Sequence, residues 1–67
     1  MIKIIVLDCS GEKLITAKVC YLEDAERIIR KWGHGNIVEV ETNLMDDLND
    51  MKDNDAFKNV RVNYVGW

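Results

Sequence analysis

Few residues of this chain are of types that perform covalent chemistry. It has one histidine, His34, and two cysteines, Cys9 and Cys20, so a thiol and the imidazole form the sole nucleophile–base combination. An imidazole beside a thiol favours the reactive thiolate. The competing interpretation is that Cys9 and His34 lie in two exposed connections without a chemical role. We predict no enzymatic activity, because a domain of 67 residues has little room for a substrate pocket.

Metal binding has two sets of candidate ligands, and neither is complete. The two cysteines and one histidine fall short of the four ligands of a zinc site, and the chain contains no Cys-x-x-Cys pair. An aspartate-rich stretch in residues 43–55 is similar in composition to a calcium loop, but it lacks the glycine at the sixth position and the glutamate at the twelfth. Its acids are Asp46, Asp47, Asp50, Asp53 and Asp55. We predict no metal and no other cofactor.

The same aspartates dominate the charge distribution. The chain has a net charge of −3, yet residues 43–55 alone carry five aspartates against Lys52, while residues 1–42 are close to neutral. Such a segment is either a solvated helix and loop, or a surface that meets a basic partner and speeds association with it. We expect any binding signal of the chain to lie there first.

Nucleic-acid binding is not expected. A phosphate-binding face needs clustered cations, and here the candidates share a predicted sheet face with Glu39 and Glu41. Trp32 and Trp67 could stack on bases, although Trp32 fits better as a core residue. The candidate cations are Lys3, Lys13, Lys18 and Arg61.

A β-hairpin is predicted at the start of the chain. Residues 1–8 and 13–21 are rich in alternating β-branched side chains, and a turn centred on Ser10-Gly11 separates them. This centring places one apolar set opposite another on one face: Ile2 with Val19, Ile4 with Ala17, and Val6 with Ile15. The other face then has Lys3 opposite Lys18, Ile5 opposite Thr16 and Leu7 opposite Leu14. Since Cys20 falls at the far end of the hairpin from Cys9, we predict that the two are not bonded.

Residues 22–32 have the spacing of an amphipathic helix. The apolar stripe is Leu22, Ala25, Ile28, Ile29 and Trp32. Glu23–Arg27 and Glu26–Arg30 are expected to form ion pairs one turn apart. Gly33 is expected to end the helix as its C′ residue, whereas Tyr21 stands where a capping side chain is usual.

The rest of the chain predicts a strand, a short helix and a last strand. The strand covers residues 36–42 with Val38 and Val40 inward, and the last strand covers residues 58–65. Between them Asn43 is expected to cap a helix in which Leu44, Leu48 and Met51 share a face. The sequence therefore predicts one α+β domain over residues 1–67, a four-stranded mixed sheet with one main helix packed on one face.

This order of elements resembles the β-grasp arrangement of ubiquitin-like proteins. The resemblance lies in element order and length, and it implies that the loop after the main helix shares one end of the domain with the hairpin turn. Ubiquitin-like modifiers end in Gly-Gly, whereas this chain ends Tyr64-Val65-Gly66-Trp67, so carrier chemistry is not implied. A β-grasp ferredoxin would need four cluster cysteines, and two are present. Residues 19–28 also resemble the strand-to-helix step of small proteins from phages and mobile elements, with Tyr21 departing from that pattern.

Protein binding is the expected function. The longest apolar run has four residues, Ile4–Leu7, so we predict no membrane span and no signal peptide, and hence a cytoplasmic protein. The open sheet face carries Ile5, Leu7, Leu14 and Val65, more apolar content than solvent contact requires. With the five aspartates, Ile5, Leu7 and Leu14 are the predicted partner-binding residues. The phage likeness would make the protein an inhibitor of a host protein, with an anti-defence role, that acts through the acidic segment. The alternative is a structural subunit that self-associates, as a homodimer, through the open face.

Overall fold

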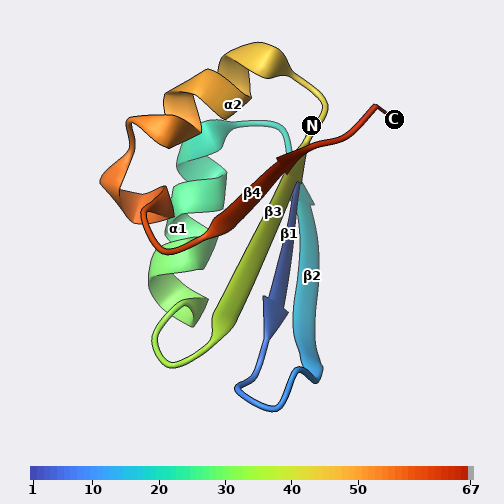
Figure 1. Cartoon of the computed structure of the whole chain (residues 1–67), viewed down its shortest axis with the longest axis vertical. Helices are drawn as coiled ribbons and strands as arrows, with labels where there is room; N and C mark the ends of the chain where they lie inside the picture. The colour runs from blue at the N-terminus through green and yellow to red at the C-terminus, as the bar shows by residue number, and fades with distance from the viewer. Residues whose placement is uncertain (67) are drawn as a thin grey trace.

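The computed structural model describes residues 1–66, and Trp67, predicted as a base-stacking candidate, lies outside them. Two helices and a 3₁₀ turn alternate with four strands in the described part of the chain (Figure 1). Their order is β1 (Ile2–Leu7), β2 (Lys13–Val19), α1 (Leu22–Trp32), β3 (Ile37–Thr42), α2 (Met45–Lys52), η1 (Asp55–Phe57) and β4 (Arg61–Tyr64). The predicted last strand, residues 58–65, is longer than β4 because Lys58 to Val60 still belong to the connection after η1.

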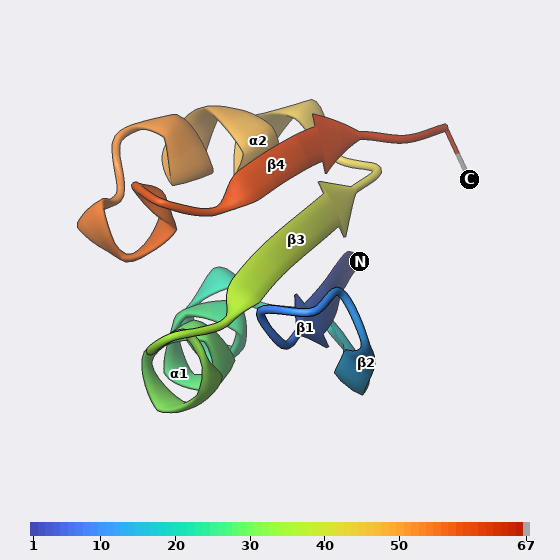
Figure 2. The same ribbon diagram turned by 60° about the horizontal axis from the view of Figure 1, so that its bottom comes forward.

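The strands form one mixed sheet in the order β2-β1-β3-β4. β1 pairs antiparallel with both β2 and β3, and β3 pairs parallel with β4. The sheet is strongly twisted, as the view in Figure 2 shows. The predicted α+β domain with a four-stranded mixed sheet is thus confirmed. Element order alone does not fix which strands pair, and here β1 lies between β2 and β3.

The hairpin register is confirmed except at the turn. Ile2, Ile4 and Val6 lie opposite Val19, Ala17 and Ile15 as predicted. Leu7, however, pairs with Lys13 and not with Leu14, because a β-bulge after Val6 makes Leu14 an extra residue in β2.

The carboxylate of Asp8 organises the turn beside that bulge. Asp8 Oδ1 accepts hydrogen bonds from Ser10 Oγ at 2.6 Å, Ser10 N at 2.9 Å and Glu12 N at 2.9 Å. Gly11 has φ +89°, a conformation that side chains disfavour. The turn geometry, and not the strand alternation, therefore sets the local register.

Helix α1 has the predicted limits, but its end differs from the expected cap. Tyr21 makes no side-chain cap bond, as predicted. Gly33 is right-handed, with φ −74°, and not in the left-handed geometry of a C′ glycine. It is a glycine because a Cβ there would lie 2.5 Å from the carbonyl oxygen of Ile29. The left-handed glycine is Gly35, at φ +74°.

The predicted ion pairs on α1 are wrong within the described residues. Arg27 pairs with Asp24, N to O 3.8 Å, and not with Glu23. Glu26 does not meet Arg30, because its carboxylate accepts a hydrogen bond from Asn54 Nδ2 across the helix layer. Asn54 Oδ1 in turn accepts from Ala56 N at 2.9 Å and starts η1. One side chain thus ties the connection after α2 to α1.

Helix α2 begins one residue later than expected. Its N-cap is Leu44, and the side chain of Asn43 does not cap it, because Asn43 Oδ1 accepts from the N-terminal amine at 3.0 Å. The hydroxyl of buried Thr42 accepts from Leu44 N at 3.2 Å. The start of α2 is therefore fixed by the end of β3.

Both helices and η1 pack on the same face of the sheet. Ala25 and Ile29 of α1, Met51 of α2 and Phe57 of η1 are buried with inward residues of β1 and β3. The sheet residues of this core are Ile2, Ile4, Val6, Val38 and Val40. The opposite face of the sheet has no helix over it (Figures 1 and 2). Neither α1 nor α2 is long and apolar enough to cross a lipid bilayer.

Candidate protein-binding surfaces

The five predicted aspartates lie on and just after α2, in the helix layer. Asp46, Asp50, Asp53 and Asp55 are exposed, and Asp47 is partly buried. We call these five residues the acidic surface. Met51 is buried on the inward side of the same helix, so packing of that side turns the aspartates toward solvent.

The acidic surface has no basic partner inside the described chain. The two ion pairs among residues 1–66 join Arg27 to Asp24 and Arg61 to Glu39, and neither includes a residue of this surface. Asp46 and Asp47 occupy the first turn of α2, where the helix dipole favours negative charge. Asp53 is the C-cap, where the dipole disfavours it. Stability of α2 therefore explains the first two acids and not Asp53.

Two large apolar side chains beside the acidic surface are exposed, although the sequence pattern placed one inward and did not single out the other. Leu44 was expected to share the inward face with Leu48 and Met51, yet it is 49% exposed, because it precedes the helix and has extended backbone. Met45, the first residue of α2, is 52% exposed. Exposed apolar side chains rimmed by polar ones are typical of a surface that a partner covers.

The open sheet face presents residues of all four strands in cross-strand rows. One row is Lys18, Lys3, Glu41 and Asn63; the next is Thr16, Ile5, Glu39 and Arg61. Arg61 and Glu39 form an ion pair at 3.7 Å. Charge on this face is therefore divided: the lysines stand on β2 and β1, and the glutamates stand on β3.

The apolar residues of the open face gather at the hairpin-turn end. Leu7 pairs with Ile37, Ile5 lies two residues along β1, and Leu14 is the bulged residue of β2. Leu14 is 45% and Ile37 is 46% exposed, while Ile5 and Leu7 are partly buried. We call these four the open-face patch. Ile37 was not predicted, although its alternation with inward Val38 and Val40 already placed it outward. Val65, predicted with this set, follows β4 at the opposite end of the sheet.

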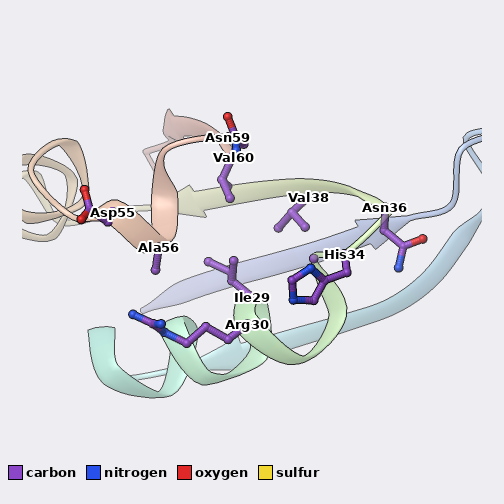
Figure 3. Close-up of a pocket in the computed structure, with 10 residues that line it drawn as sticks. Ile29, Arg30, His34, Asn36, Val38, Asp55, Ala56, Asn59 and Val60 are labelled. Carbon is purple, nitrogen blue, oxygen red and sulfur yellow. The ribbon is translucent and has the colours of Figure 1, made fainter.

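A groove of about 430 Å³ separates the end of α1 from η1 and the start of β4 (Figure 3). Its floor is apolar, from Ile29, Val38, Ala56 and Val60. Arg30 and His34 stand on the α1 side, and Asp55 and Asn59 on the other. Asp55 therefore joins the acidic surface to this groove. No thiol, serine or threonine lines it, so it offers polar contacts and no nucleophile.

Cys9 and His34 do lie at the same end of the fold, in the hairpin turn and in the loop after α1 (Figure 1). Both are exposed, and none of the side-chain hydrogen bonds found within residues 1–66 joins them. Cys9 and Cys20 are free thiols, as predicted. No group of three or more histidine, cysteine, aspartate or glutamate side chains in residues 1–66 is placed to hold a metal ion.

Comparison of the chain with protein-family models, with curated proteins and with solved structures gives no match. Function is therefore inferred from the surfaces of the chain itself.

Proposed function

We propose that this protein is a small, non-catalytic protein-binding module whose acidic surface docks on a basic surface of its partner. The observation that carries the proposal is that five neighbouring carboxylates have no basic partner within residues 1–66. Exposed Leu44 and Met45 at the start of the same helix would supply apolar contact area. Asp53, placed where it weakens the helix, supports a role in recognition over a role in stability.

The partner is a protein with clustered lysines or arginines on its surface. Charges of opposite sign at such an interface accelerate association and confer salt dependence. If the likeness of residues 19–28 to phage and mobile-element proteins reflects the origin of the chain, the partner is a host factor whose basic surface normally meets nucleic acid. The protein would then act in the cytoplasm as an anti-defence inhibitor of that host factor.

Affinity capture from the source organism, followed by titration of the captured protein, tests the proposal. The test variant replaces Asp46, Asp50 and Asp53 with asparagine. A control variant replaces Glu12 and Glu23, exposed acids of the hairpin turn and α1, with glutamine. We expect binding at least about tenfold weaker for the test variant, near wild-type binding for the control, and a steep loss of wild-type affinity with salt. Equal binding of both variants, or capture of the chain alone, would overturn the proposal.

A further inference from the structure

The open sheet face is the second unpartnered surface, and its charges are self-complementary. In the row at one end of the sheet Lys3 stands on β1 beside Glu41 on β3, with Lys18 on the other side of Lys3. Two lysines directly opposite each other on a sheet repel. Neither lysine, nor Glu41, takes part in an ion pair within residues 1–66. This row therefore holds charges that a second sheet could pair.

We propose that the occupant of this face is a second copy of the chain, packed sheet to sheet about a two-fold axis parallel to the strands. Such an axis, placed between β1 and β3, lays β1 of one copy over β3 of the other. It keeps each row at its own level. Lys3 then faces Glu41 of the second copy, and Leu7 faces its Ile37. Aligned sheets in β-sandwiches pack in this way, about 10 Å apart.

The remaining positions of the rows fit the same arrangement without like charges facing each other. Lys18 meets Asn63, and Thr16 meets Arg61. Ile5 lies over Glu39, whose carboxylate is already paired with Arg61 of its own chain. A hollow of about 320 Å³ lined by Met1, Lys3, Lys18 and Asn43 opens at this end of the face. It would receive the Glu41 carboxylate of the second copy between two lysines. Within the open-face patch, Leu7 and Ile37 of each copy would close against Ile37 and Leu7 of the other, as in an isologous interface.

The size of the face predicts a modest dimer. Four strands spaced by about 4.8 Å, with six residues each rising about 3.3 Å, give a projected face of roughly 400 Å² per copy. Side-chain relief increases the accessible area, but the interface stays near the lower limit for specific association. The dimer is therefore expected to form at micromolar or higher concentration and to weaken with salt.

Charge reversal tests the pairing, with sedimentation equilibrium as the measurement. Lys3→Glu and Glu41→Lys each convert two attractive pairs of the dimer into repulsive ones, so each variant alone should associate at least about tenfold more weakly. In an equimolar mixture each copy supplies the charge that the other lacks, so a heterodimer should form. This rescue cannot come from the neighbouring Lys3–Glu41 positions within one chain, because each chain of the mixture keeps its own like charges.

Lys58→Glu and Glu23→Lys, exposed charges of the helix layer, are the matched controls and should leave self-association unchanged. Ile37→Asp is a second route, since Ile37 is 46% exposed and faces Leu7 of the second copy, so its substitution should spare folding while it abolishes the dimer. A wild-type chain that stays monomeric at millimolar concentration in low salt would overturn the proposal. So would a mixture of the two reversed chains that associates no better than either alone. Self-association can fail in this way while the acidic surface still binds its partner.

Discussion

The side chain of Asn54 connects the segment after α2, which carries part of the acidic surface, to α1, and we expect the stability of the fold to depend on it. Asn54 Oδ1 accepts from Ala56 N, and Asn54 Nδ2 donates to the Glu26 carboxylate, so Asn54→Ala removes both bonds. A side-chain cap contributes about 1 kcal/mol, and a hydrogen bond to a charged group about 1.5–3 kcal/mol. Because both sites are only partly buried, we expect the lower end, a loss of about 2–3 kcal/mol.

This loss is large for the chain as a whole. At about 0.05–0.15 kcal/mol per residue, a 67-residue domain has a free energy of unfolding of roughly 3–10 kcal/mol. Urea denaturation followed by tryptophan fluorescence measures the global effect. Amide hydrogen exchange measures the local one, and there α2 and η1 should lose more protection than the β1–β2 hairpin, which Asn54 does not touch.

Two further substitutions separate the cap from the bridge. Asn54→Asp keeps an acceptor for Ala56 N but places a carboxylate beside Glu26, so it should keep the cap and lose the bridge. A double-mutant cycle of Asn54→Ala with Glu26→Ala isolates the bridge itself. Asn59→Ala, at an exposed asparagine in the next connection, is the control. The reasoning fails if Asn54→Ala lies within about 0.5 kcal/mol of wild type, or if the cycle shows no coupling.

Three other predictions concern the turn, the second helix and the end of the first. Hydrogen bonds from the Ser10 side chain and from the backbone of Glu12 and Ser10 lower the pKa of Asp8 below its ordinary 3.8, so they stabilise the fold above that pH and are lost as the pH falls through the lowered value. Asp8→Asn should therefore lower the thermal midpoint at pH 7, with a difference from wild type that disappears in acid; a constant difference would refute this. At the C-cap of α2, Asp53→Asn should raise the free energy of unfolding by about 0.3–1 kcal/mol, measured by urea titration. Asp46→Asn, in the first turn, should lower it by a similar amount. Effects of the same sign would rule out a helix-dipole origin. Gly33→Ala should lower the free energy of unfolding by about 1–3 kcal/mol, because its Cβ would meet the Ile29 carbonyl. Gly66→Ala, where a Cβ would meet no atom within 4 Å, should leave it unchanged. Equal thermal midpoints for the two variants would contradict the steric argument.

The elements with strong local patterns were predictable from the sequence. The hairpin has a register that buries three apolar pairs at once, and α1 has one apolar stripe bounded by Tyr21 and Gly33. The bulge at Leu14 was not predictable from alternation, because hydrogen bonds to Asp8 set it. Strand order was equally hidden, since it depends on which crossover packs best on the core and not on any local segment.

The residues of the helix layer also differ in whether the sequence alone could place them. The aspartates could be placed on an exposed helix because their spacing leaves Met51 for the core. Phe57 could not be placed, because it is a lone aromatic residue in a polar stretch without periodicity, and burial of such a residue is a tertiary property. Asn54 gave no signal either, because its role requires a partner 28 residues away.

The two proposed surfaces follow from the way the described elements are layered. The helices α1, α2 and η1 all pack on one sheet face, and the core forms there. None of them covers the other face, where Leu14 and Ile37 are exposed and favour association with a second copy. Because the acidic surface belongs to the helix layer, a sheet-to-sheet dimer would turn both acidic surfaces outward. Self-association and partner binding would then not compete, and the dimer would add avidity toward a partner with two basic sites without any change in the contacts at each.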